Sequence, residues 1–273
     1  MSGERSYRLI GRSPTKVDGP AKVTGETRFA DDLSLPRMLH AKLLRSPIAH
    51  GRILSIDAAR AEAMPGVVAV ITGQSMPVTF GILPVSQDEH ALALDRVRFV
   101  GDPVVAVAAT DEEIAYEAIQ AIHVEYEPLD AVFEPEKAIR NDTVPLHVYG
   151  DDGNVHKRVS MQFGEVEQAL ENADLVLDDT FFFGGNTHLP MEQHATLANP
   201  EADGRLTIWS STQTPHYLHR SLAKVLEMPP SRIRVIACSN GGGFGGKSDP
   251  FNHEIAVAKL ALVTGRPVKI ALT

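Results

Sequence analysis

The sequence has little cysteine and no long apolar run. Cys238 is the only cysteine among 273 residues, so an intrachain disulfide is excluded, as is an iron–sulfur cluster held by this chain's thiolates alone. No run approaches about 18 uninterrupted apolar residues, and residues 1–11 carry charges but no apolar core of a signal peptide. These absences favour a cytoplasmic chain without a membrane span.

Basic residues are also few relative to acidic ones. The chain has 26 Lys and Arg against 35 Asp and Glu, a formal net charge of -9, which argues against a nucleic-acid surface dominated by basic residues. A small-molecule substrate fits this balance better. With 43% hydrophobic and 22% charged residues, the composition is that of a globular protein with one large or two medium domains.

Periodicity in the first half predicts a mixed α/β (α+β) fold. Thr110 and Glu113 form a capping-box pattern before a helix over 111–122, between strands over 104–108 and 123–126. This strand, helix and strand are the unit expected of one α/β layer. Residues 12–32 are predicted to be irregular because their prolines and glycines forbid a helix. Four further strands are predicted over 38–45, 52–56, 67–72 and 97–100, with a short helix over 57–63.

A stretch rich in Pro, Gly, Asn and Asp divides the chain. We interpret residues 1–133 as an N-terminal arm and first mixed domain, 134–160 as a linker and 161–273 as part of a second domain. The second part is predicted to contain strands over 175–183, 206–211, 233–237 and 266–273, and helices over 164–172, from 215 to about 228, and over 255–262.

The second half contains two similar corners between a strand and a helix. One strand ends near Ser211 and turns through Gln213, and another ends near Ser239 and turns through the glycine loop GGGFGG at 241–246. Glycine permits close approach of the backbone to a ligand, and each helix N-terminus carries partial positive charge. If both corners face one cleft, Gln213 and Phe244 line the same pocket, which suits an anionic or strongly polar group.

Two familiar motifs fit this loop, but the rest of the chain does not support either. The phosphate-binding pattern G-x-x-x-x-G-K-[ST] ends at Lys247 and Ser248, yet no acidic residue follows on a later strand to hold Mg²⁺. The dinucleotide pattern G-x-G-x-x-G expects an acid about 20 residues on, and none follows Glu254. A loop that only allows close packing remains open, and Lys247 either contacts a phosphate or is solvated.

Several histidines and one glutamate have both a functional and a structural interpretation. His188 with His194, and His216 with His219, suggest metal pairs, but zinc needs three or four convergent ligands. Structural or substrate-lining histidines are therefore favoured. Glu192 beside His194 suggests an acid and base pair, and a hydrogen-bonded structural carboxylate is the alternative that we favour.

Several stretches together resemble the molybdopterin-binding subunit of the xanthine dehydrogenase and aldehyde oxidase family. They are GGGFGGK after an RIRV strand, the STQTP corner, RSPTKVDGPAKVTGETRFADD, LLRSPIAHGRI, RFVGDPVVAVAATDEEIAYEA and MEQHATLA. The resemblance covers nearly the whole chain. Within the family, FGILPVSQDEHALALDRVRFVGDPVVAVAA and SSTQTPHYLHRSLAKVLEM look most similar to the 4-hydroxybenzoyl-CoA reductase branch.

The resemblance implies an α/β hammerhead domain over about 20–130, followed by the first part of a molybdopterin-binding domain. It implies that Gln213 approaches the molybdenum centre and that backbone amides around Gly243, Phe244 and Gly245 lie beside its oxo group, with no direct metal ligand in this chain. The implied cofactor is molybdopterin with molybdenum, in a cytosine dinucleotide form. FAD and iron–sulfur clusters are expected on partner subunits, beside a C-terminal molybdopterin-binding chain or segment.

Two departures from the family pattern limit the function. Purine-oxidising members carry a glutamate directly after GGGFGGK, whereas this chain has Ser248, which disfavours xanthine. Family members are also longer, and the general-base glutamate and most pterin contacts are expected in that C-terminal part. The resemblance thus implies no catalytic residue here but part of a molybdenum hydroxylase for an aromatic or heteroaromatic substrate. Reductive dehydroxylation of the hydroxybenzoyl-CoA type and a non-catalytic scaffold fragment are the alternatives.

Overall fold

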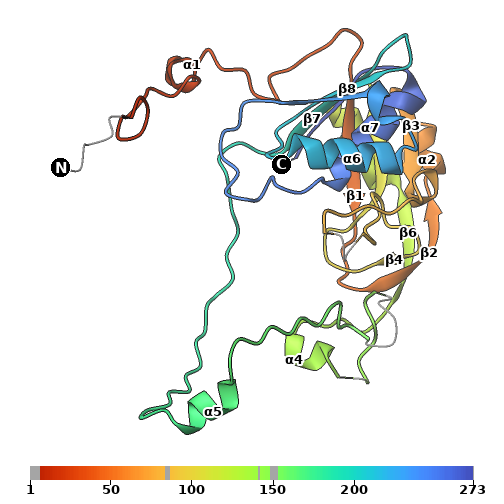
Figure 1. The fold of residues 1–273 in the computed structure, drawn as a ribbon. Helices are drawn as coiled ribbons and strands as arrows, with labels where there is room; N and C mark the ends of the chain where they lie inside the picture. Colours follow the sequence, from red (N-terminus) through yellow and green to blue (C-terminus); the bar gives the residue numbers. More distant parts are fainter. Residues whose placement is uncertain (1–6, 84–86, 141, 148–152, 273) are drawn as a thin grey trace.

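The computed structural model describes residues 7–83, 87–140, 142–147 and 153–272 (Figure 1). The strands are β1 Leu39–Arg45, β2 Gly51–Asp57, β3 Val67–Thr72, β4 Arg96–Val97, β5 Pro103–Ala109, β6 His123–Pro128, β7 Ala195–Pro200, β8 Leu206–Ser210, β9 Ile233–Ala237 and β10 Val268–Ala271. The helices are α1 Gly19–Thr24, α2 Ala59–Glu62, α3 Glu112–Ala121, α4 Pro135–Ala138, α5 Val166–Glu171, α6 Pro215–Val225 and α7 Asn252–Thr264, with 3-10 turns η1 Gly73–Ser75 and η3 Pro230–Arg232. None of the helices in these ranges is long and apolar enough to cross a membrane.

One seven-stranded sheet joins the two halves of the chain. Its order is β3-β5-β1-β10-β7-β8-β9, with β1–β10 and β8–β9 parallel and the other pairs antiparallel. Strands β4, β2 and β6 form a separate three-stranded sheet. The large sheet contains β1, β3 and β5 from before the predicted linker and β7 to β10 from after it. The two parts of the chain therefore share one sheet, and their division into domains over 1–133 and 161–273 stays a prediction.

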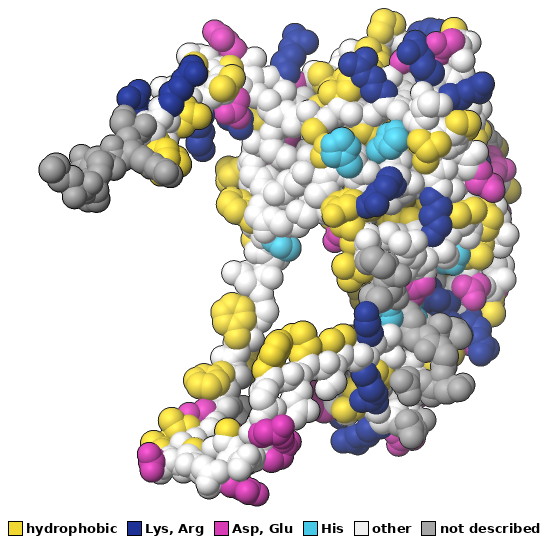
Figure 2. Space-filling model, viewed as in Figure 1, with side chains coloured by type: hydrophobic (Ala, Val, Ile, Leu, Met, Phe, Trp, Pro, Cys, Tyr) yellow, Lys and Arg dark blue, Asp and Glu magenta, His cyan; other side chains and the backbone are white. Residues whose placement is uncertain are grey.

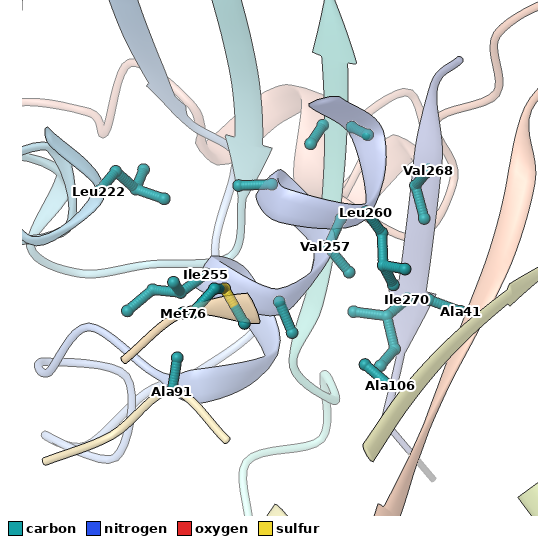
Figure 3. Packing of buried hydrophobic residues seen from close by; sticks show 14 of the residues in the cluster. Ala41, Met76, Ala91, Ala106, Leu222, Ile255, Val257, Leu260, Val268 and Ile270 are labelled. Carbon is teal, nitrogen blue, oxygen red and sulfur yellow. The ribbon is translucent and has the colours of Figure 1, made fainter. Parts of the chain in front are cut away.

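Helices cover both faces of the large sheet, and the central strands are apolar for that reason. Every residue of β5 is buried. Ala106 and Ala108 of β5 belong to the core cluster beneath α7, while Val105 and Val107 belong to the cluster that includes α3. Figure 3 shows Val257 and Leu260 of α7 on the side of β10, near Ile270, and Ile255 of the same helix beside Met76. Strands enclosed on both faces lack the alternation of polar and apolar residues that marks a half-exposed strand.

Most predicted elements are present with small shifts at their ends. The predicted strand over 67–72 coincides with β3, and the predicted helix over 111–122 contains α3. The N-cap of α3 is Asp111 rather than Thr110, because the Asp111 side chain accepts a hydrogen bond from the Glu113 N–H at 2.8 Å. The predicted α/β class is confirmed by this mixed architecture.

The predicted α/β layer around α3 is wrong in one respect. Strand β5 belongs to the large sheet, but β6 pairs antiparallel with β2 in the small sheet. The helix therefore links two sheets instead of returning the chain to the sheet that it left. Local periodicity specifies a strand, while its pairing partner depends on contacts distant in sequence.

Two further predictions differ from the structure, one strand was missed, and the predicted linker contains a short helix. Residues 12–32 contain α1, because Pro20 occupies its first turn and Gly25 ends it in the left-handed conformation with φ of 76°. The predicted linker contains α4 over part of its described length. Strand β7 was not predicted, and the predicted strand over 175–183 has no strand pairing and is exposed. In Figure 1 this last segment rises from α5 toward β7, away from the sheet.

The packing of α7 predicts where shortening a side chain is costly. Leu260 is completely buried, so Leu260→Ala should lower the free energy of unfolding by about 2–5 kcal/mol, measured by urea denaturation. Val263 on the same helix is 56% exposed, and Val263→Ala is the matched control, with an expected change below about 0.5 kcal/mol. Equal losses for the two variants would contradict the orientation of α7.

Candidate functional site

Strands β8 and β9 end together at one edge of the sheet. They run parallel with Ser210 opposite Ala237, and the Cys238 N–H donates to the Ser210 carbonyl at 2.9 Å. The chain then turns into α6 at Pro215 and, after the glycine loop, into α7 at Asn252. The two predicted corners are thus confirmed as neighbours. Parallel strands place their carboxyl ends at one edge, where ligands of open α/β sheets commonly bind.

Gln213 joins the two corners. Its backbone N–H donates to the Lys247 carbonyl at 2.8 Å, and its side-chain Oε1 accepts from the Lys247 N–H at 3.1 Å and from the Ser248 hydroxyl at 3.3 Å. These bonds occupy the oxygen of the amide and fix the side chain against the loop. Within the described part of the chain the Nε2 group donates no hydrogen bond, so it remains a donor for a bound group.

A single carboxylate oxygen holds both ends of the glycine loop. Oε2 of Glu192 accepts from the Gly241 N–H at 2.9 Å and from the Lys247 ammonium at 2.6 Å. The Lys247 side chain is completely buried and that of Glu192 is 11% exposed, so water scarcely screens the pair. The interpretation of Lys247 as solvated is wrong. Glu192 is a hydrogen-bonded carboxylate, and its partner is Lys247.

Close contacts explain why two positions in the loop are glycine. A Cβ at Gly243 would lie 2.5 Å from Cδ of Gln213, and a Cβ at Gly246 would lie 2.8 Å from Cγ of His188. Phe244 has φ of 51°, and its side chain is 75% exposed. The structure therefore brings Gln213 and Gly243 together but leaves the Phe244 ring on the surface. The ring does not close a pocket within this chain.

The loop has a series of free backbone donors. Among the residues that the structure describes, the N–H groups of Gly242, Gly243, Phe244 and Gly245 donate no hydrogen bond, and Gly243 itself is buried. Oε1 of Glu192 is also buried without a partner in the same part of the chain. Unpaired buried polar groups in a native fold require an explanation, and a ligand is one. Successive N–H donors beside a helix N-terminus suit an anionic or oxygen-rich group.

The neighbouring histidines and the cysteine do not form a metal centre. Among the described residues, no three His, Cys, Asp or Glu side chains converge on a common point. Burial and the nearby Lys247 lower the pKa of His194, whose ring packs edge-on against Phe251 at 4.8 Å. Nε2 of His219 lies 3.0 Å from the Pro230 carbonyl. Burial raises the pKa of Cys238 to about 11, so its thiol is not a nucleophile at neutral pH.

A second buried carboxyl, not predicted from the sequence, lies at the start of α7. Glu254 accepts from the Phe251 N–H at 2.8 Å and from the Ser210 hydroxyl at 2.5 Å, and Ser210 in turn pairs with Thr196. Burial raises the pKa of Glu254 to about 7. This residue links the first turn of α7 to β8 and β7. A glutamate three residues after a helix N-cap is a recognisable sequence signal, but its burial is not.

Breaking the Glu192–Lys247 pair should be costly because it leaves a nearly buried charge without a partner. We expect Lys247→Met to lower the free energy of unfolding by about 3–5 kcal/mol, and Glu192→Gln in the same chain to recover part of the loss. Lys42→Met is the control, since Lys42 pairs with Glu112 at the same 2.6 Å but Glu112 is 57% exposed. Urea denaturation measures both variants. If Lys247→Met and Lys42→Met each lower the free energy of unfolding by less than about 1 kcal/mol, the buried Glu192–Lys247 pair does not stabilise the loop as described.

The buried Glu254 predicts a pH dependence of stability. Because the pKa is raised in the folded state, the folded protein retains a proton that the unfolded chain loses, and stability should fall as pH rises from about 4.5 to about 7. The loss should reach up to about 3 kcal/mol. Glu254→Gln should remove this part of the profile, while Glu117→Gln, at an exposed position, should leave it unchanged. A Glu254→Gln profile that coincides with that of the parent protein would contradict the assignment.

Comparisons with known proteins agree with this arrangement. Residues 24–130 match the aldehyde oxidase and xanthine dehydrogenase a/b hammerhead domain, and residues 148–273 match the molybdopterin cofactor-binding domain. The nicotinate dehydrogenase large molybdopterin subunit of Eubacterium barkeri is 37% identical over 268 residues, which are 97% of this chain and 62% of the relative. The xanthine dehydrogenase molybdenum-binding subunit of Escherichia coli O157:H7 is 37% identical over 272 residues, 94% of this chain and 35% of the relative.

A solved structure shows the same fold. Quinoline 2-oxidoreductase from Pseudomonas putida 86 superposes with a TM-score of 0.89 at 34% identity, over 98% of this chain and 35% of that one. The chain thus spans between about a third and just under two thirds of the length of these relatives. From the two domain matches and the relatives, the chain belongs to the xanthine dehydrogenase and aldehyde oxidase family, as the N-terminal part of a molybdopterin-binding large subunit.

Proposed function

We propose that this chain supplies one wall of the molybdenum site in a hydroxylase-type oxidoreductase. The observation that carries the proposal is the glycine loop held by Glu192, with four free N–H groups next to the free amide nitrogen of Gln213. These donors lie on neighbouring turns at one edge of the sheet. A site built in this way fits the oxygen-rich surroundings of molybdenum in its pterin.

The residues of this chain would bind and orient the cofactor. The N–H groups of Gly243, Phe244 and Gly245 and the Nε2 group of Gln213 would donate to its negatively polarised oxygen atoms, and none of them would be a metal ligand. Molybdenum with its pterin, when bound, supplies the oxidation–reduction chemistry and the transfer of oxygen from water. Glu192 keeps the donors in place, because it prevents the loop from opening.

The relatives and Ser248, which lies just after the loop, support a proposal for the substrate class. The relatives are named for nicotinate, xanthine and quinoline, which are all nitrogen-containing aromatic rings. Ser248 stands where purine-oxidising members carry a glutamate, and its hydroxyl is bonded to Gln213. We therefore propose an aromatic nitrogen heterocycle other than a purine. The sequence resemblance to the 4-hydroxybenzoyl-CoA reductase branch supports reductive dehydroxylation as a second candidate.

Partners complete the proposed enzyme. A further molybdopterin-binding segment would supply the general-base glutamate and the remaining pterin contacts, and separate subunits would carry the iron–sulfur clusters and FAD. Two relatives are named as molybdopterin or molybdenum-binding subunits, which supports a complex of several chains. We propose the cytosine dinucleotide form of the pterin and a cytoplasmic complex. If the loop instead holds nothing, the chain is a scaffold.

The amide of Gln213 provides a direct test in the assembled complex. Gln213→Ala should lower kcat on the heterocyclic substrate by roughly a hundredfold, as expected for loss of one preorganised donor, while molybdenum content measured by mass spectrometry stays unchanged. The matched control is Gln74→Ala, which removes the same amide from an exposed position in η1.

Three outcomes separate the candidates in that experiment. Molybdenum absent from the complex purified with its genomic neighbours would overturn the proposed enzyme and leave the scaffold. Activity on aryl-CoA substrates but not on heterocycles would replace the oxidative proposal with the reductive one. Equal rates for the Gln213→Ala and Gln74→Ala variants would contradict the role of Gln213.

A further inference from the structure

A cavity of about 510 Å³ lies along α6, here called the α6 cavity. One wall comes from residues 80–83 and Gln87 in the first half of the chain, and the other from Tyr217, Arg220 and Lys224 of α6. Figure 2 shows Lys or Arg side chains next to hydrophobic ones over this helix. Both walls belong to this chain, and the volume is that of a pocket for a small molecule.

Two cations in the α6 cavity have no acidic partner. Arg220 and Lys224 are four residues apart on α6 and therefore lie on the same face. Among the described residues neither pairs with a carboxylate: Arg220 lies over the Tyr217 ring at 4.8 Å from its centroid, and Lys224 donates to Oε1 of Gln87 at 3.2 Å. In a chain with a net charge of -9, two such cations in one cavity favour an anionic ligand.

The cavity also offers an apolar surface beside these charges. Leu83 is 56% exposed and Tyr217 is 40% exposed, while Phe80 is buried behind them. The Ser221 hydroxyl, on the same helix, makes no hydrogen bond within the described part of the chain and is a further donor. A small inorganic anion has no use for the apolar side chains. The combination suits a compound that carries both phosphate and a flat ring.

The α6 cavity is close to the candidate metal site but separate from it. Helix α6 begins at Pro215, two residues after Gln213. A helical rise of about 1.5 Å per residue places Lys224 about 14 Å along the axis from Pro215. A single aromatic ring beside Gln213 does not reach that far. A long substrate with a phosphate-bearing end, however, can occupy both places.

We propose that the α6 cavity binds a nucleoside diphosphate group, with its phosphates on Arg220 and Lys224 and its base against Tyr217 and Leu83. Arginine suits phosphate because its planar guanidinium donates parallel hydrogen bonds, and lysine adds a point charge. The group belongs either to a free nucleotide or to the nucleotide end of a coenzyme A thioester. Binding does not require molybdenum, so the inference extends the proposed function, and only a thioester substrate as the source rests on it.

Calorimetric titration of the assembled complex with ADP tests the cavity. Arg220→Gln and Lys224→Gln should each weaken ADP binding by about tenfold or more, because each removes one charge from the phosphates. Both side chains are exposed, so urea unfolding should not change. Arg60→Gln is the matched control, since Arg60 is an exposed arginine on α2 and the variant should bind ADP normally.

Four outcomes of that titration are decisive. Absence of ADP binding in an active complex that contains molybdenum would overturn this inference and leave the proposed function intact. ADP binding in a complex without molybdenum would support the inference and overturn the proposed function. Equal affinities for the Arg220→Gln and Arg60→Gln variants would overturn the assignment to this cavity. Loss of molybdenum from the Arg220→Gln complex would also overturn it, because the cation would then serve the cofactor.

Steady-state kinetics of the same variants distinguish the two sources of the nucleotide. If the group is the end of a thioester substrate, Arg220→Gln should raise the KM for an aryl-CoA by about tenfold with little change in kcat, and leave the KM for a heterocycle unchanged. If a free nucleotide is the ligand, ADP should change the rate on a heterocycle in the parent complex but not in the Arg220→Gln complex. Either result supports the cavity, and identical kinetics for parent and variant in both assays would overturn it.

Discussion

The bond of Glu192 to both ends of the glycine loop is the interaction on which the candidate site depends. A loop of five glycines and one phenylalanine between Asn240 and Lys247 has little intrinsic preference for one shape. Because one carboxylate oxygen accepts from Gly241 and from the buried Lys247, the loop is fixed at both ends in a region that water scarcely screens. The N–H groups of residues 242–245 make no hydrogen bond within the described part of the chain, and the entropic cost of ordering the loop is met before any ligand binds.

The large sheet gives this loop its position. Strands β8 and β9 are parallel and in register, so the Gln213 corner and the glycine loop start from the same edge, and the two hydrogen bonds between Gln213 and Lys247 join them. Strand β10 then connects this region to β1 of the first half. The site is thus supported by strands from both parts of the chain. The first half contributes strands to the sheet that carries the site, although it supplies none of the donors.

Much of this arrangement follows from local sequence signals, and the rest depends on distant contacts. The helix after Asp111, the strand over 67–72 and the two corners are readable because capping, β-branched runs and glycine act over a few residues. Strand β7, ATLANP, escapes prediction because Ala, Asn and Pro are poor strand formers and Thr196 is its only β-branched residue. The pairing of Glu192 with Lys247, 55 residues away, is not encoded in local periodicity. The family resemblance was enough to identify Gln213 and the glycine loop as candidate site residues. Only the structure shows that Glu192 and Lys247 hold them in place.

The position of molybdenum in the assembled complex tests whether the glycine loop and Gln213 form one wall of the metal site. Crystals of the complex, measured at the molybdenum absorption edge, would give an anomalous difference peak that locates the metal independently of any assumed cofactor geometry. We expect the peak next to the N–H groups of Gly243 to Gly245 and the amide of Gln213, with no side chain of this chain as a ligand. A peak located elsewhere, or a molybdenum atom coordinated by a histidine or cysteine of this chain, would contradict the proposed site.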